Sequence, residues 1–467
     1  MSVAPTIAQR LARFAFRADA VPATVTDDVA RRVRDLIGNS LAAADSEPAE
    51  VISRIVDAAA GAPQAGMIGR PGRAPASLAA LFNGTVAHAL DFDDTHLPSV
   101  LHPSASVIPA ALAVAQARGA SGASFSRAVA VGDEITIRLG MAGYDERSRD
   151  SVYFAKGFHA TSICGTVGAA AAAAVLYGLD ADAISHALAI AASLGAGLLE
   201  ANRTGGSVKR IHCGWAAHAG ISAAEMAAAG LTGPPTAFEG RFGFLQAFLD
   251  ERFNANAITR GLGRDWELVK MFFKPYPCNH FTQAGIDAAL ELRRRGLDPD
   301  EVAEVELGVP GAVLRTIAEP AAEKAAPPNG YTARFSGPFT FATALVGGGG
   351  LGVYLDDFTD EGARDERRLA LARRVRCVAD PECDAIFPFE FPAIARVRTT
   401  AGTHLEVKVL HNRGGPSNPL SVGELKKKFA LNAERALAPE RVARLDELLD
   451  RLIDLGGVGE LLEYAAP

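Results

Sequence analysis

Polar side chains suited to acid–base chemistry gather in four short segments of an otherwise apolar chain. These segments are AHALDFDDTHLPSVLHPSAS (87–106), KGFHATSICGT (156–166), RTGGSVKRIHCGWAAHAG (203–220) and KPYPCNHF (274–281). Each of the first three places a histidine or lysine in a glycine- or proline-containing loop that leads into an apolar helix. Because a helix N-terminus presents free N–H groups and a positive dipole end, the pattern predicts a site for a small polyanion.

Two histidines in these segments, His102 and His159, are the candidates for proton transfer, because imidazole titrates near neutral pH. A carboxylate from the same segments could orient one of them. Two lysines, Lys209 and Lys274, would stabilise the negative charge that develops when a proton leaves a carbon next to a carboxylate. Elimination of water fits these groups, and so do decarboxylation and epimerisation.

Several of these residues also have simpler interpretations. Asp93 and Asp94 could be solvated or helix-capping acids, and His96 is more simply a surface residue of a loop. His159 taken alone could be a satisfied buried histidine, and Lys209 with its arginine neighbour a solvated basic pair. Three histidines in helical patterns are interpreted as structural: His186, His212 and His218.

A metal site is conceivable in the DFDDTH run (91–96), which offers hard oxygen ligands and a histidine. The run lacks the spacing of an EF-hand, and the chain contains no HExxH motif. The glycine run 347–350 lacks the Lys-Ser/Thr of a phosphate loop, and no GxSxG elbow supports a serine hydrolase. These patterns therefore favour neither a metal site nor a phosphate-binding loop nor a serine hydrolase.

The bulk composition excludes several function classes. The 467 residues carry a formal net charge of −7, which does not indicate nucleic-acid binding. Five cysteines without a CxxC pair argue against a disulfide framework and favour a reducing compartment, so a soluble cytoplasmic protein is expected. The uncharged run 160–178 is mostly Ala, Gly, Ser and Thr, which favours a closely packed buried helix over a membrane span.

The elements that must position these residues are mostly helices. Thr26 is expected to cap a helix, and further helical stretches are predicted at 75–90, 104–118, 124–142, 161–177, 181–199 and 214–229. Beyond residue 263 the pattern changes. Alternation at 303–309, 393–399 and 405–409 predicts strands, the last two forming a hairpin, with helices near 281–297, 335–346 and 364–374.

Helix resumes after a predicted capping box of Ser421 and Glu424. The predicted fold class is therefore mainly α. One large all-helical domain is formed by both chain ends (1–269 and 412–467), and a smaller α+β lid domain (270–411) is inserted between them. An insertion of this kind creates an interface and a hinge, where ligand clefts often lie.

Over nearly its whole length the chain resembles the MmgE/PrpD family. The resemblance is carried by NGTVAHALDFDDTH and HPSASVIPAALA within 83–114, GFHATSICGTVGAAAAAA (157–174), VKRIHCGWAAHAG (208–220), FKPYPC (273–278) and NPLS (418–421). It implies the same two-domain layout, a homodimer, and catalysis without metal or organic cofactor. The family's active-site positions fall here on Asp91, Thr95, His102, His159, Lys209 and Lys274.

By this analogy His102 and His159 move protons, Asp91 orients a histidine, and Lys209 and Lys274 hold carboxylates, with Thr95 also in the substrate site. Family members often have a histidine at the position of Gln283, whereas this chain offers His280, which we assign to substrate binding. The expected reaction is dehydration of a hydroxylated di- or tricarboxylate of the 2-methylcitrate class. Decarboxylation, epimerisation of an amino or imino dicarboxylate, and polycarboxylate binding without catalysis remain the alternatives.

Overall fold

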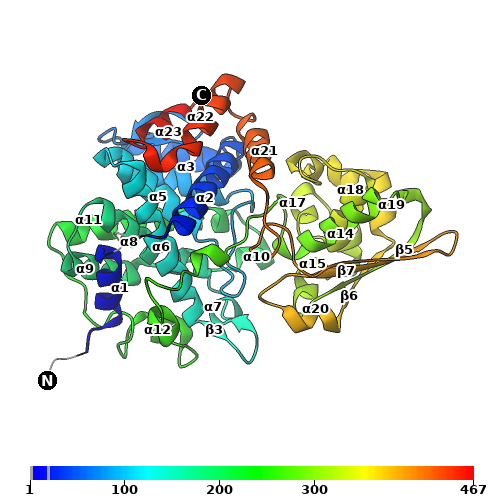
Figure 1. Cartoon of the computed structure of the whole chain (residues 1–467), viewed down its shortest axis with the longest axis horizontal. Coiled ribbons are helices and arrows are strands. Elements are labelled where there is room, and N and C mark those ends of the chain that lie inside the picture. The colour runs from blue at the N-terminus through cyan, green and yellow to red at the C-terminus, as the bar shows by residue number, and fades with distance from the viewer. Residues whose placement is uncertain (1–3, 18–20) are drawn as a thin grey trace. The chain divides into compact units, whose positions relative to one another are not determined.

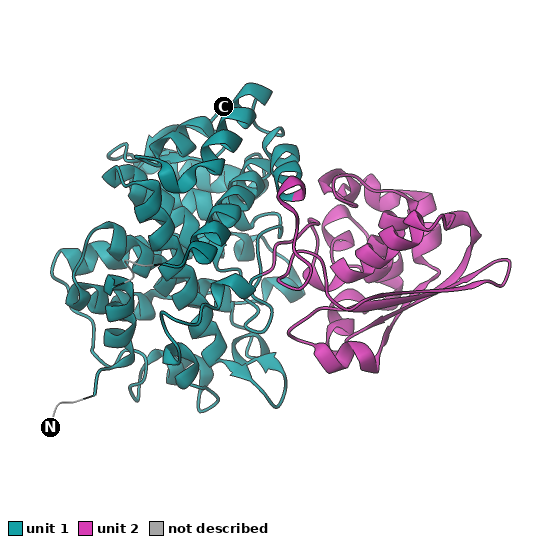
Figure 2. Ribbon diagram, in the orientation of Figure 1, with its two compact units in different colours: residues 1–271, 425–467 teal, residues 272–424 magenta. Residues whose placement is uncertain are grey.

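Two compact units make up the chain in the computed structural model, which describes residues 4–17 and 21–467. The first unit comprises Met1–Met271 and Leu425–Pro467, and the second comprises Phe272–Glu424 (Figure 2). The chain is mainly helical, as predicted. Whether the second unit acts as a lid stays a prediction.

The first unit is built almost entirely from helices (Figure 1). Its longer helices are α1 (Ile7–Arg17), α2 (Ala23–Ala42), α3 (Glu47–Ala59), α4 (Ala76–His88), α5 (Ser104–Arg118), α6 (Gly122–Ala142), α8 (Ala160–Leu176), α9 (Ala181–Leu194), α11 (His212–Ala228), α21 (Val422–Ala433, which begins in the second unit) and α22 (Pro439–Asp450). Its shorter elements are α7 (Val152–Ala155), α10 (Ala201–Thr204), α12 (Phe244–Leu249), α13 (Asn256–Thr259), α23 (Gly459–Tyr464), β1 (Ala65–Met67), β2 (Arg70–Ala74), β3 (Tyr144–Asp145) and β4 (Asp150–Ser151).

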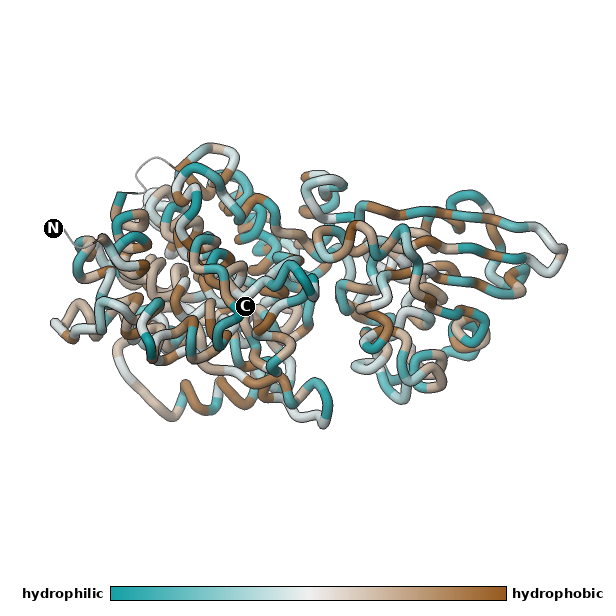
Figure 3. Tube along the Cα trace, turned by 90° about the horizontal axis from the view of Figure 1, so that it is seen from below, coloured by the Kyte–Doolittle hydropathy of each residue, from teal (hydrophilic) through white to brown (hydrophobic). Residues whose placement is uncertain are grey.

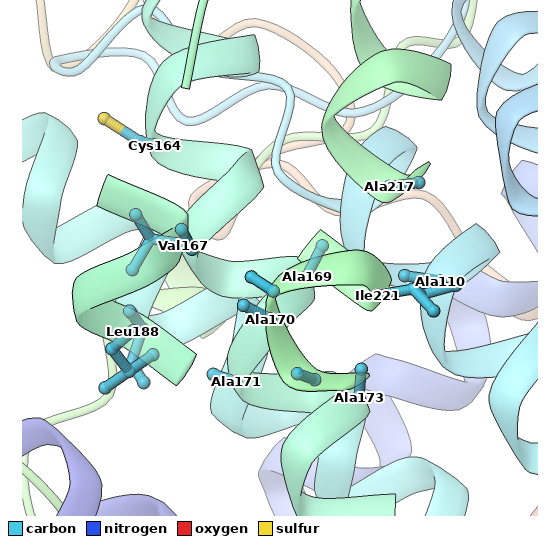
Figure 4. Packing of buried hydrophobic residues seen from close by; sticks show 14 of the residues in the cluster. Ala110, Cys164, Val167, Ala169, Ala170, Ala171, Ala173, Leu188, Ala217 and Ile221 are labelled. Atoms are coloured by element: carbon cyan, nitrogen blue, oxygen red, sulfur yellow. The ribbon is translucent and has the colours of Figure 1, made fainter. Parts of the chain in front are cut away.

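Helix α8 lies at the centre of this unit and packs chiefly against α6 and α11. Alanines of α8 fill the contact (Figure 4), and a Cβ atom added to Gly220 of α11 would lie 2.5 Å from the Cβ of Ala169. Such small side chains let helix axes approach closely. This confirms the buried helix predicted from the uncharged run. Within the described part of the chain, no helix combines the length and apolarity needed to cross a membrane.

Helices α4 and α11 also approach closely, at a pair of glycines. A Cβ atom added to Gly84 would lie 2.8 Å from the Cα of Gly214, well inside van der Waals contact. No larger residue fits either position without moving a helix. The helix ends near this contact, His88 at the end of α4 and His212 at the start of α11, are therefore held by close backbone packing.

The predictions for helix starts had mixed outcomes. Ser421 and Glu424 form the predicted capping box: the Ser421 backbone N–H donates to Glu424 Oε2 at 2.8 Å, and the Ser421 hydroxyl accepts from the Glu424 N–H at 3.2 Å. The prediction that Thr26 caps a helix was wrong, because α2 begins at Ala23, directly after Pro22. Proline favours a helix start since it lacks the N–H that would be left unbonded there.

The second unit is an α+β structure around a four-stranded sheet. Its strands are β5 (Val302–Val309), β6 (Val375–Ala379), β7 (Ala393–Thr399) and β8 (His404–Val409). Its helices are α14 (Gln283–Arg294), α15 (Leu314–Ile317), α16 (Ala321–Ala325), α17 (Gly330–Ala333), α18 (Gly337–Val346), α19 (Glu366–Ala372) and α20 (Pro381–Ile386). The strand order is β6-β5-β7-β8, with β5 and β6 parallel and the other pairs antiparallel.

The predicted hairpin is β7–β8, whose turn contains Gly402 at φ +82°. Apolar and polar residues follow one another along these strands (Figure 3). The apolar side chains of β5, β7 and β8 join those of α14 and α18 in one core that belongs to the second unit alone. Strand β6 was not predicted, because five residues carry too short a pattern to distinguish strand from helix.

Candidate active site

Four histidines from separate segments meet inside the first unit. His88 is the last residue of α4, His102 precedes α5, His159 precedes α8, and His212 is the first residue of α11. Neighbouring ring centroids lie 5.1 Å apart for His102 and His88, 5.5 Å for His88 and His159, and 5.1 Å for His159 and His212. We call this row of imidazoles the histidine cluster. His102 is half-buried and the other three are buried.

The carboxylate bonded to this cluster is that of Asp93. Its Oδ2 lies 2.8 Å from Nδ1 of His88 and 3.6 Å from Nδ1 of His102. Asp93 and Asp94 are both buried, so their interpretation as solvated acids was wrong. Asp91, the predicted orienting acid, is half-buried in the turn after α4 and has a left-handed backbone with φ +55°. Its role stays a prediction.

His88 carries a positive charge at neutral pH. Burial alone would lower its pKa, but the neighbouring carboxylate of Asp93 and the thiol of Cys213 outweigh burial and raise the pKa to about 10. The result is a buried imidazolium–carboxylate pair. Sequence reasoning missed His88, although it stands in the same segment as Asp93, five residues earlier.

His102 is held in one tautomer by the loop that carries it. Its Nδ1 lies 2.7 Å from the backbone oxygen of Asp94, an atom that can only accept, so Nδ1 carries the proton. The loop is anchored in turn, because the Asp94 carboxylate accepts from Arg32 at 3.1 Å and from Ser104 at 2.5 Å. Thr95 is buried beside it, with its hydroxyl 3.4 Å from His102 Nδ1.

His159 and His212 share a hydrogen bond between their Nδ1 atoms, which lie 2.9 Å apart. Burial, followed by the positive charges of His88 and Lys209, lowers the pKa of His159 well below its usual value and that of His212 to about 4. The interpretation of His212 as purely structural overlooked this contact. A signal was present, because His159 and His212 both stand at the N-terminal end of an apolar helix.

Lys209 lies near the histidine cluster, and its place in the substrate site stays a prediction. It lies in the 3₁₀ turn Val208–Ile211, directly before α11, and is half-buried. Its charge reaches both His159 and His212, as the lowered pKa values of the two rings indicate. A lysine so placed can pair with the carboxylate of a ligand.

Lys274 and His280 belong to the second unit, and both are buried. Nε2 of His280 lies 3.0 Å from the side-chain amide of Asn412, which donates to it, and the ring meets that of Phe391 edge-on at 5.3 Å. This fixes the His280 ring in place. The participation of Lys274 and His280 in one site with the histidine cluster stays a prediction.

The spacing of His88, Asp93 and His102 could also hold a metal ion, since each offers a ligand atom within 4.8 Å of the others. Metal ligation requires a neutral imidazole. A metal ion bound here would therefore have to displace the proton that the raised pKa of His88 holds on its imidazole.

His96 lies outside the histidine cluster, and its interpretation as a surface residue was wrong. His96 is 1% exposed. Its Nδ1 lies 2.7 Å from the hydroxyl of Ser99, within the loop between His88 and His102. Burial, with the charges of Lys270 and Arg32, lowers its pKa to about 3. His96 is thus a neutral residue that shapes the loop.

We expect this buried histidine to make the fold acid-sensitive. The unfolded chain binds a proton on His96 below about pH 6.5 and the folded chain does not, so stability falls as pH drops from 6.5 toward 3. Replacing His96→Asn should reduce the loss of unfolding free energy between pH 7 and pH 5 by about 2 kcal/mol. Urea unfolding of both proteins at the two pH values measures it, and identical losses would contradict the assignment.

Comparison with known proteins matches both units to one family. Residues 9–255 match the family model of the MmgE/PrpD N-terminal domain, and residues 276–454 that of the MmgE/PrpD C-terminal domain. The cis-aconitate decarboxylase of Mus musculus is 29% identical over 398 residues, which cover 83% of this chain and 78% of the relative. The human enzyme is 29% identical over 395 residues (82% and 78%), and a cis-aconitate decarboxylase-like protein of Aspergillus oryzae is 27% identical over 410 residues (82% and 81%).

Proposed function

The chain belongs to the MmgE/PrpD family of enzymes, and from that premise we propose that it is a lyase that decarboxylates an unsaturated tricarboxylate of the cis-aconitate class. The observation that carries the proposal is the match to cis-aconitate decarboxylases over about four fifths of both chains. The same comparison favours decarboxylation over the dehydration of a 2-methylcitrate-like acid that the sequence led us to expect.

The chemistry of decarboxylation needs the groups that the histidine cluster provides. The bond between the carboxyl carbon and the substrate skeleton breaks, carbon dioxide leaves, and the electron pair stays on the skeleton until a proton is added there. Each turnover thus consumes one proton. The cations of His88 and Lys209 stabilise the anionic substrate and the negative charge that develops, while His102 and His159 supply and restore the proton.

The remaining predicted residues complete the proposed site. Lys274 and His280 would bind carboxylates from the second unit, with Thr95 beside His102 in the first. Closure of the second unit over a bound acid would exclude water from the carbanion before it is protonated. We retain a homodimer, a cytoplasmic location and independence of metal and cofactor as parts of the proposal.

Carbon dioxide release tests the proposal directly. The purified protein, treated with EDTA, is incubated with cis-aconitate, and we expect stoichiometric carbon dioxide with one new C–H bond per turnover. Parallel incubations use 2-methylcitrate and an amino dicarboxylate in deuterium oxide. Water loss from the hydroxy acid without carbon dioxide would favour a dehydratase, exchange without net product an epimerase, and thermal stabilisation without turnover a binding protein. Activity that requires added metal would contradict the cofactor-free mechanism.

A further inference from the structure

His212 contacts His159 through a hydrogen bond between their Nδ1 atoms, and this contact points to a role for His212. We propose that His212 is a positioning residue, whose Nδ1 accepts a hydrogen bond from Nδ1 of protonated His159 and thereby directs proton delivery to the substrate through Nε2 of His159. The inference rests on the proposed function and deepens it. Nothing in the family comparison assigns a role to this residue.

The geometry allows only one proton between the two rings. With the Nδ1 atoms 2.9 Å apart, one nitrogen must donate and the other accept, since two N–H groups cannot face each other at this distance. The Nδ1 of His159 is therefore committed to its partner. The only nitrogen with which His159 can exchange a proton with anything else is Nε2.

Gly197 and Ser162 hold the pair in place. The backbone N–H of His159 donates to the Gly197 carbonyl at 3.0 Å, and the Ser162 hydroxyl donates to the His212 carbonyl at 3.1 Å. Gly197, at φ +146°, lies close to both histidines, since a Cβ atom there would lie 3.2 Å from Cβ of His159 and 3.4 Å from Nδ1 of His212. The rings have little freedom to rotate away from each other.

The charged groups around His159 explain why it needs a partner that accepts a hydrogen bond. The titratable and charged groups that face the pair are His88 from α4, His102 from the loop before α5, and Lys209 from the turn before α11. The positive charges among them oppose protonation of His159. A hydrogen bond accepted by neutral His212 favours the protonated ring and offsets part of this opposition.

The proton balance of the reaction fits this arrangement. Protonated His159 gives its Nε2 proton to the substrate carbon as carbon dioxide leaves, and the pair becomes neutral with Nδ1–H still donated to His212. A proton from water then restores Nε2–H for the next turnover. The bond to His212 stays formed through both states, so the ring keeps its orientation.

Two substitutions separate positioning from simple packing. In His212→Asn the side-chain oxygen can take the place of Nδ1 and accept the bond, whereas His212→Leu fills more of the ring's volume but accepts nothing. We expect His212→Leu to lower kcat at pH 7 by about 100-fold, the lower end of what general acid–base catalysis contributes. The alkaline limb of its pH–kcat profile should move to lower pH by about one unit, and His212→Asn should recover at least about tenfold of the lost rate.

The controls and contrary outcomes are specific. His218→Leu and His218→Asn alter a half-buried histidine on the same helix, whose Nδ1 bonds to the Ser77 carbonyl, and should leave kcat within about twofold. A packing role predicts that Leu equals or exceeds Asn at position 212, and that result, or unchanged rates in both variants, overturns the inference.

A measurement without substrate separates this inference from the proposed function. In ¹⁵N-histidine-labelled wild-type protein we expect the Nδ1 resonances of His159 and His212 to report one shared proton, and His212→Leu to abolish that signal. The signal without decarboxylation of any acid would refute the proposed function and leave the pairing intact. Decarboxylation without the signal would refute the pairing alone.

Discussion

Replacing His159 by glutamine is expected to lower kcat for decarboxylation by about 10²–10⁴-fold while KM changes far less. Glutamine keeps a polar side chain in the buried position but cannot carry a proton to carbon. The ring of His159 is central in the histidine cluster, with neighbours on both sides, so its loss removes proton transfer rather than substrate binding.

Initial rates of carbon dioxide release over a range of cis-aconitate concentrations give both constants. The matched control is His186→Gln on α9, a half-buried histidine whose Nδ1 accepts from the backbone N–H of Gly233 at 3.3 Å. A double variant of His102 and His159 is expected to have about the same kcat as the slower of the two single variants. The effects of substituting residues that act as a unit are not additive. A His159→Gln enzyme with near-normal kcat would remove this residue from the chemistry.

The substitution Asp93→Asn is expected to lower the free energy of unfolding by about 3–5 kcal/mol at pH 7, because it leaves the imidazolium of His88 buried without its counter-ion. The sign of the pH dependence follows from the same pair. The pKa of His88 is raised in the folded protein, so its contribution to stability is complete below about pH 6.5 and is lost as pH rises through about 10. The Asp93→Asn variant should lose less stability over this range.

Chemical unfolding at pH 7 and pH 9.5 measures both effects. The exposed pair of Lys156 and Asp250 is the matched control, since its atoms are 2.9 Å apart but lie at the surface. Asp250→Asn should cost less than about 1 kcal/mol. Adding His88→Gln to Asp93→Asn should restore part of the loss. Equal costs for the buried and the exposed substitution would show that His88 is neutral in the folded protein.

The helices of the first unit were largely predictable because periodicity and composition act locally. The stretches expected at 104–118 and 161–177 match α5 and α8 within one residue, and the strand at 303–309 matches β5. Errors arose where a neighbouring residue changed a boundary. Pro22 starts α2 ahead of Thr26, and α9 ends at Leu194, five residues before the predicted end.

The site was predictable only in part. His102, His159 and Lys209 stand in loops that lead into helices, a local feature that a sequence displays, and the structure brings His102 and His159 into one cluster. The roles of His88 and His212 depend on contacts between helices distant in sequence. A histidine at helical spacing looks the same in sequence whether it faces apolar side chains or another imidazole, and the packing of α11 against α4 and α8 decides which.

Each of the two units has its own apolar core, so local unfolding can differ between them. All four histidines lie in the first unit, whereas Lys274 and His280 lie in the second. Cores that share no side chains can melt as independent cooperative blocks. Amide hydrogen exchange should then divide the protein into two protection classes. In a molecule whose second block has transiently melted, the histidine cluster of the first unit would stay assembled and able to exchange protons with water.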